Sequence, residues 1–354
     1  MTSGARRPTS DVIEVNAAAE IGVRNSQPPG IGRVVALGDL TCWNNLGRNI
    51  VFADRQFRPR GVFGQTLFPD QDEPSQFDLD IHAVLDLPEL GLLLVLNHFG
   101  CVRGFRRAEL VGPGPPREVE PTAMTFFAAD VERTVLAGRH IVGSRPRCDG
   151  AQGVLVSALI DSTALDAPIE TDVAAERFGE VTAVGVVDGA SEPLVALGGA
   201  DRVALVPLVR GSILRPRWEV EVGFRVAVVV WDGRLIWAAG SATTSRVDDY
   251  DWEALRGGGF AGLDPRDGGV VAAGALPEDV AWGTGGVSVV VLGNQLAAIG
   301  RTGRVYLRDP GRPTPWCSTA PLASASLGLA HADVVGHRVL FGFNRGGYHL
   351  HLYG

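Results

Sequence analysis

The sequence contains no lysine, since all 32 basic residues of the 354 are arginine. A P-loop lysine, a Schiff-base lysine and a lysine general base are therefore excluded. The four cysteines form no Cys-x-x-Cys pair, so their spacing indicates neither a zinc site nor a redox motif. The lysine deficit, together with the 46 glycines, is typical of the composition that a GC-rich genome imposes.

Long apolar runs are also absent. No run approaches the roughly 18 residues that a membrane span requires. The first residues, MTSGARRPTSDVIEV, lack the apolar segment of a secretion signal. The formal net charge of -8 disfavours general attraction to nucleic acid. We therefore expect a cytoplasmic protein with no membrane span and no nucleic-acid partner.

Short apolar segments recur along the chain. They are rich in Val, Leu, Ile and Ala and end in Gly, Asp, Asn or Arg, whereas long amphipathic helical patterns are scarce. Strand-turn-strand units start about 42 residues from one another, except at two wider gaps. Each unit is preceded by another apolar strand. The units lie at 49–63, 92–105, 133–146, 193–208, 234–247, 295–310 and 339–354. This period predicts an all-β, seven-bladed β-propeller.

The two ends of the sequence predict how the ring closes. The last unit ends at Gly354 after only three strands, while DVIEV at residues 11–15 is a strand without a blade of its own. We expect residues 11–15 to complete the last blade, which leaves no exposed sheet edge there. The chain is then a flexible N-terminus, residues 1–10, followed by one propeller domain over residues 11–354.

Three segments carry a family resemblance. AAIGRTGRVYLRDP (297–310) and VALGGADRVALVPL (195–208) resemble the strand-turn-strand half of a WD40 repeat, and VVVWDG (228–233) carries a Trp-Asp pair. The usual Gly-His and terminal Trp-Asp dipeptides are missing from most units. The resemblance implies an interaction platform, although a fold alone does not fix a function.

Basic residues recur in the turn of each strand-turn-strand unit. If these turns join the second and third strands, they share one face of the propeller, with a histidine, His98, in the second unit and arginine in the others. Guanidinium groups match carboxylates and phosphates well, so we predict that these arginines bind an anionic ligand or an acidic protein segment. The predicted binding residues are Arg55, Arg139, Arg202, Arg301 and Arg345. The alternative is that, without lysine, any exposed basic position is simply arginine.

An acidic segment at residues 68–82 is expected on the same face. Its carboxylates are Asp70, Asp72, Glu73, Asp78 and Asp80. One hypothesis is a lid that pairs with the arginines and weakens with salt. Calcium binding and an ordinary solvated loop are the other two interpretations.

Histidines near the same face give a second hypothesis for the function. His82, His98 and His331, with Asp80, are candidate ligands for a divalent metal such as iron or zinc, and Asp78 or Asp80 is a candidate general base. This hypothesis predicts a metal-dependent oxygenase or hydrolase. The leading hypothesis is a non-catalytic binding or scaffold module, and the sequence does not decide between them.

Overall fold

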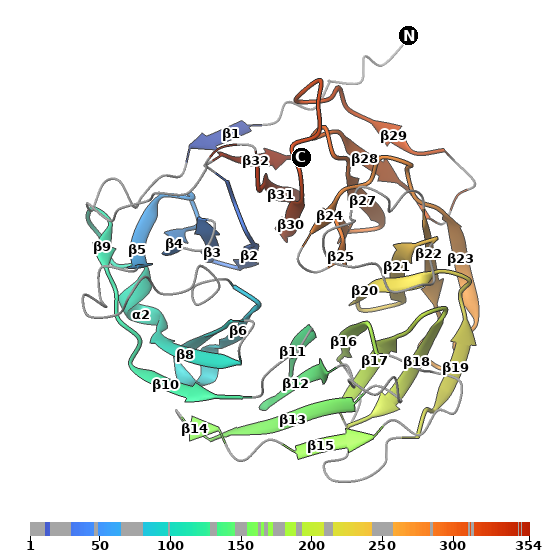
Figure 1. Ribbon diagram of the computed structural model, residues 1–354, viewed down its shortest axis with the longest axis horizontal. Helices are drawn as coiled ribbons and strands as arrows, with labels where there is room; N and C mark the ends of the chain where they lie inside the picture. The colour runs from blue at the N-terminus through green and yellow to red at the C-terminus, as the bar shows by residue number, and fades with distance from the viewer. Residues whose placement is uncertain are drawn as a thin grey trace.

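The structure of the chain is a computed structural model, and its elements are almost all strands arranged as blades around a central axis (Figure 1). The all-β, seven-bladed propeller predicted from the sequence is confirmed. No helix in the described part of the chain is long and apolar enough to cross a membrane. The described residues are 11–14, 30–45, 49–64, 81–97, 100–127, 133–145, 154–161, 164–165, 169–172, 181–188, 193–208, 215–242, 258–283, 286–310, 312, 315–345, 347 and 349–354.

The first three blades follow one another along the chain. Blade 1 contains β2 (Val34–Leu37), β3 (Leu40–Asn45), β4 (Asn49–Asp54) and β5 (Pro59–Gly64). Blade 2 contains β6 (Ala83–Leu87), β7 (Leu92–Leu96), β8 (Cys101–Arg106) and β10 (Ala123–Phe126). Blade 3 contains β11 (Arg133–Ala137), β12 (His140–Arg145), β13 (Val154–Asp161), β14 (Ala164–Leu165) and β15 (Ile169–Asp172).

The remaining blades continue the same antiparallel order. Blade 4 contains β16 (Ala183–Val187), β17 (Leu194–Gly198), β18 (Arg202–Pro207) and β19 (Trp218–Glu221). Blade 5 contains β20 (Arg225–Trp231), β21 (Ile236–Ser241), β22 (Gly258–Leu263) and β23 (Val270–Ala275). Blade 6 contains β26 (Val289–Leu292), β27 (Gln295–Ile299), β28 (Val305–Arg308) and β29 (Cys317–Ser318). Blade 7 contains β30 (Ala330–Val335), β31 (Arg338–Phe343), β32 (His349–Tyr353) and β1 (Asp11–Glu14).

Beyond the strands assigned to the seven blades, the described residues form five short elements. A 3-10 turn, η2 (Pro88–Leu90), joins the first two strands of blade 2, and β24 (Trp282–Gly283) pairs with β25 (Gly286–Val287) before blade 6. After β8 the chain forms α2 (Arg107–Leu110) and then β9 (Arg117–Glu118). β9 runs parallel to β5 on the outer edge of blade 1 before the chain returns to β10 in blade 2.

The first strand of each blade faces the central axis (Figure 1). Because successive strands of a blade are antiparallel, the turns between its second and third strands lie on one face of the propeller. We call this the upper face; it also carries the connections between blades. The turns between first and second strands, and between third and fourth strands, lie on the lower face.

Apolar packing between neighbouring blades forms the core. Seven buried clusters occur among the described residues, and each combines side chains from two adjacent blades. The second strand of a blade has a strand on each side and a blade against each face, which explains why β7, LLLVL, is buried at all five positions. Every blade therefore needs a neighbour on each side.

The pairing of β1 with β32 closes the ring, as the sequence predicted. Asp11 lies opposite Leu352 and Glu14 opposite His349, in antiparallel register. Two further bonds join blade 7 to the start of blade 1: Ile31 N–H donates to the Phe343 carbonyl at 2.8 Å, and Ala36 N–H donates to Asp333 Oδ2 at 2.8 Å. The first and last strands of the described chain thus share one blade.

Removal of β1 tests the closure. We expect deletion of residues 1–15 to lower the melting temperature by roughly 5 °C or more, because β32 loses its outer partner and becomes an exposed edge. Deletion of residues 1–10 is the control and should leave the melting temperature unchanged. Thermal unfolding followed by circular dichroism measures both, and equal stability of the two deletions would contradict the closure.

Candidate functional site

Arg301 and Arg345 come together on the upper face at blades 6 and 7. Arg301 lies in the turn between β27 and β28, and Arg345 follows β31, as the sequence predicted. Leu327, in the connection between the two blades, links the turns: its N–H donates to the Arg301 carbonyl at 2.8 Å, and its own carbonyl accepts from Arg345 N–H at 3.1 Å. The backbone thus fixes the two arginines as neighbours.

An apolar residue lies beside this pair. The N–H of Leu322 donates to the Thr302 carbonyl at 2.9 Å, next to Arg301, and the Leu322 side chain is 40% exposed. Arg345 is exposed and Arg301 is half-buried, with its N–H bonded to the Asp279 carbonyl at 2.8 Å. Arg301, Arg345 and Leu322 thus lie on neighbouring ordered turns of the upper face.

Arg202 also lies on the upper face, but the carboxylates of its own blade surround it. Its guanidinium lies 3.4 Å from Asp201, 3.3 Å from Glu219 and 3.6 Å from Glu221, measured between nitrogen and oxygen. The side chain is only 20% exposed. Its charge is therefore largely matched inside blade 4, and Arg202 contributes less to the upper face than the sequence suggested.

Arg55 and Arg139 do not lie on the upper face, and their predicted placement is wrong. Arg55 follows β4, so its turn joins the third and fourth strands of blade 1. Arg139 lies between β11 and β12, the first and second strands of blade 3. Both turns belong to the lower face, where both arginines are exposed. The predicted ring of five arginines is split between the two faces.

The excursion of β9 explains the error in blade 3. After β8 the chain pairs β9 with the neighbouring blade, so β10, the apolar strand just upstream of the unit at 133–146, is the outer strand of blade 2 and not the inner strand of blade 3. In blade 1, the six-residue strand β3 precedes the unit at 49–63, which therefore contains the third and fourth strands of the blade. The signal that identifies the first turn is a glycine at positive φ in a two-residue connection, as at Gly38 (φ 68°) and Gly138 (φ 61°). That signal assigns Arg139 to the lower face.

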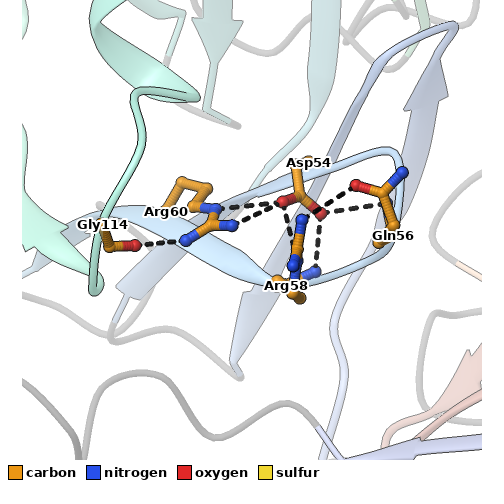
Figure 2. Close-up of polar contacts among 5 residues, drawn as sticks. All are labelled: Asp54, Gln56, Arg58, Arg60 and Gly114. Atoms are coloured by element: carbon orange, nitrogen blue, oxygen red, sulfur yellow. Dashed lines mark hydrogen bonds and ion pairs between the residues drawn. The ribbon is translucent and has the colours of Figure 1, made fainter.

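Asp54 organises the lower-face turn that carries Arg55 (Figure 2). Its carboxylate accepts the N–H groups of Gln56 at 2.9 Å and Arg58 at 3.1 Å, together with the guanidinium groups of Arg58 and Arg60. Arg60 also reaches the carbonyl of Gly114, in the segment that follows α2. The cluster fastens the turn to the chain that leaves blade 2, which is a structural role.

The pKa of Asp54 gives a test of that role. Burial opposes ionisation, but the hydrogen bonds from Arg58, Arg60 and Gln56 outweigh it and hold the pKa below its ordinary 3.8. We expect D54N to lower the free energy of unfolding by about 1 kcal/mol at neutral pH, since the cluster is partly solvated.

The pH dependence of the D54N effect checks its cause. A lowered carboxyl pKa stabilises the fold above the unfolded value and loses that effect as the pH falls through the folded value. Urea titrations of wild type and D54N should therefore converge in acid. A stability difference that persists at low pH would show that the cause is packing and not charge.

The candidate metal ligands are only partly described. Asp80 and His98 lie outside the described residues. His82 precedes β6 in blade 2, and His331 lies on β30 in blade 7, with blade 1 between them. Both are buried. Among the residues that the structure describes, no group of three or more His, Cys, Asp or Glu side chains is placed to hold a metal ion.

Arg33 connects the two buried histidines. Its Nη1 donates to the backbone carbonyl of His82. Burial, and then the positive charge of Arg33, lower the pKa of His331 to about 3 from an ordinary 6.5. A fixed guanidinium near both residues repels a cation electrostatically. Nothing in the described chain therefore favours the metal-enzyme hypothesis.

Substitution of His331 should flatten the acid limb of the stability curve. The pKa of His331 is lowered in the folded chain, so between about pH 6.5 and pH 3 the unfolded chain binds a proton at this residue and the folded chain does not. The free energy of unfolding therefore decreases as the pH is lowered across that window. H331N should reduce the proton uptake on unfolding by close to one. Urea titrations between pH 7 and about pH 4 measure it, with H337N, at an exposed turn, as the control. Equal slopes for wild type and H331N would contradict the assignment.

Two other predicted features lie outside the described residues. The acidic segment, with Asp70, Asp72, Glu73, Asp78 and Asp80, falls within 65–80. The turn expected in the unit at 234–247, with Arg246, falls within 243–257. The lid hypothesis and the calcium hypothesis therefore remain predictions.

Comparison with known proteins supports the fold class. The chain has the WD40-like seven-bladed propeller fold. It is similar to the WD40 domain of Pan2 from Neurospora crassa, with TM-score 0.63, 10% identity and coverage of 99% of this chain and 96% of that one. It is also similar to the WD40 propeller domain of Doa1, with TM-score 0.54, 12% identity and coverage of 93% and 94%.

A designed protein shows the same likeness. The computationally designed Ika8 protein has TM-score 0.51 and 11% identity over 92% of this chain and 96% of that one. No protein-family model and no curated protein matches the sequence. At identities this low the similarity concerns the fold alone.

Proposed function

We propose that the chain is a non-catalytic binding or scaffold propeller that holds an acidic segment of a partner protein on its upper face. The observation that carries the proposal is the pairing of Arg301 and Arg345 through Leu327. Both arginines lie on turns fixed by backbone hydrogen bonds, so the backbone of these turns loses little conformational entropy when a partner binds.

The residue types at this site suit a carboxylate-bearing partner. Guanidinium groups form paired hydrogen bonds with carboxylates, and such charge-assisted bonds are stronger than neutral ones. Leu322 adds an exposed apolar contact next to Arg301. Arg202 lies farther round the same face and is matched by Asp201, Glu219 and Glu221, so it plays a minor part.

A small anion such as phosphate or citrate is the other ligand that two arginines accommodate. The partner segment is preferred because Leu322 is exposed beside the charges, and a small inorganic anion makes no use of an apolar side chain. The WD40-like fold agrees with a platform role, since propellers of this type characteristically act as interaction platforms.

Charge reversal on one face tests the proposal. The double variant R301E/R345E should weaken binding of a fluorescein-labelled decapeptide of Asp, Glu and Leu by about tenfold or more, because two attractive contacts become repulsive. Fluorescence anisotropy at about 50 mM and about 300 mM NaCl measures the affinity, which should fall with salt.

The split of the arginines between the faces supplies a matched control. R55E/R139E makes the same change in net charge on the lower face and should leave the affinity unchanged. Equal weakening by the two double variants would show general electrostatic attraction and overturn the proposal. The small-anion alternative would be favoured if millimolar citrate displaced the peptide and if replacing the Leu residues of the peptide left its affinity unchanged.

A further inference from the structure

Arg103 is a buried cation between blades 1 and 2. It lies on β8, and only 6% of the residue is exposed. Its guanidinium carbon lies 5.6 Å from the centroid of the Phe63 ring on β5. Its Nε is buried without a hydrogen-bond partner, and no carboxylate among the described residues forms an ion pair with it.

A buried charge without an anion is costly for the fold. The face of an aromatic ring offsets part of that cost but supplies no hydrogen-bond acceptor. Other arginines in the same region are matched: Arg60 pairs with Asp54, and Arg107 pairs with Asp39 and Asp86. The enclosed Nε of Arg103 therefore carries a desolvation cost in the free protein, which an external anion beside the guanidinium would offset.

Exposed apolar side chains lie directly beside Arg103. Met124 and Phe126, on the outer strand β10, are 56% and 57% exposed. Met124 is the cross-strand neighbour of Arg103, and Phe126 is that of Cys101. Residues opposite one another in an antiparallel pair point to the same side of the sheet. Met124 and Phe126 thus form an apolar border next to the guanidinium.

In the part of the chain that the structure describes, no strand pairs with the outer edge of β10. Phe127 N–H donates to the Gly100 carbonyl, and in this register Met124 and Phe126 direct their own N–H and carbonyl groups away from β8. β14 lies near β10 but pairs with β13. The outer strands β15, IETD, and β19, WEVE, carry charges that discourage added strands, whereas β10, AMTF, and β23, VVAAGA, carry none. Of these strands, only β10 has a buried arginine opposite it, at Arg103.

We propose that Arg103, Met124 and Phe126 form a docking site for an extended segment of a partner protein that carries a carboxylate next to apolar residues. The carboxylate pairs with Arg103, the apolar side chains pack on Met124 and Phe126, and the backbone pairs with the edge of β10. The flexible side chain of Met124 moves aside to admit the carboxylate. This site lies on the side of the propeller and does not depend on the upper-face arginines.

The probe is a phage-displayed library of random heptapeptides, selected on the full chain. We expect enriched sequences to carry Asp or Glu flanked by apolar residues. A synthetic copy of the most enriched peptide should lose affinity about tenfold when its acid is replaced by the amide, measured on wild type alone. Enrichment of peptides without an acid, or no enrichment above background, would overturn the proposal.

Two variants separate binding from stability. R103M removes the buried charge and keeps the volume, so it should abolish the preference for the acid while raising the melting temperature by a few degrees. F126S alters an exposed side chain and should weaken peptide binding with the fold intact. V271S is the control, because Val271 is a comparably exposed residue on β23 of blade 5.

The melting temperature of R103M distinguishes this proposal from a structural role. If R103M is less stable than wild type, Arg103 stabilises the fold and the proposal fails. The proposal also fails if R103M and wild type bind the acidic peptide equally. Because R301E/R345E leaves this site untouched, peptide binding there should survive that double variant even where binding to the upper face is lost.

Discussion

The structure depends on the closure of the ring by β1 and β32. Each apolar cluster is shared between two neighbouring blades, so no blade can bury both of its faces unless the ring is complete. An opening between blades 7 and 1 would expose the cluster that contains Trp43 and Leu340. The antiparallel pairing of Asp11–Glu14 with β32 links one end of the chain to the other and prevents that opening.

A second set of bonds ties the inner strands together at their upper ends. In three blades the residue just before the inner strand donates from its side chain to the next blade's backbone. Thr182 reaches the Val226 carbonyl at 2.6 Å, Ser288 reaches the Ala330 carbonyl at 2.5 Å, and Arg33 reaches that of His82. The donors are a threonine, a serine and an arginine, so this hydrogen bond recurs from blade to blade without a recurring residue type in the sequence. These bonds hold the upper-face turns on a fixed frame.

The sequence predicts the general plan of the fold well because strand alternation and turn residues are local signals. Seven blades and the closing strand at Asp11–Glu14 follow from them. The register of blade 3 did not follow, because β9 leaves its own blade to pair with β5, and that pairing is non-local. In blade 1 the missed element was local, because β3 follows β2 after a two-residue turn. The burial of Arg103 was equally hidden, since it depends on Phe63 from another blade. Within CVRGF, Arg103 looks like any arginine on a strand.

A chain without lysine uses arginine for every cationic role, and only the neighbours of each arginine tell the roles apart. Where the guanidinium pairs with carboxylates of its own blade, as at Arg60 and Arg202, the charge strengthens a turn or a blade. Arg301 lies on an ordered turn beside an exposed leucine, and there we propose a partner-binding role for the charge. Arg103 is the extreme case, because it is buried on an aromatic ring and no carboxylate among the described residues pairs with it. Under the proposed docking role, Arg103 is retained for binding despite its cost to the stability of the fold.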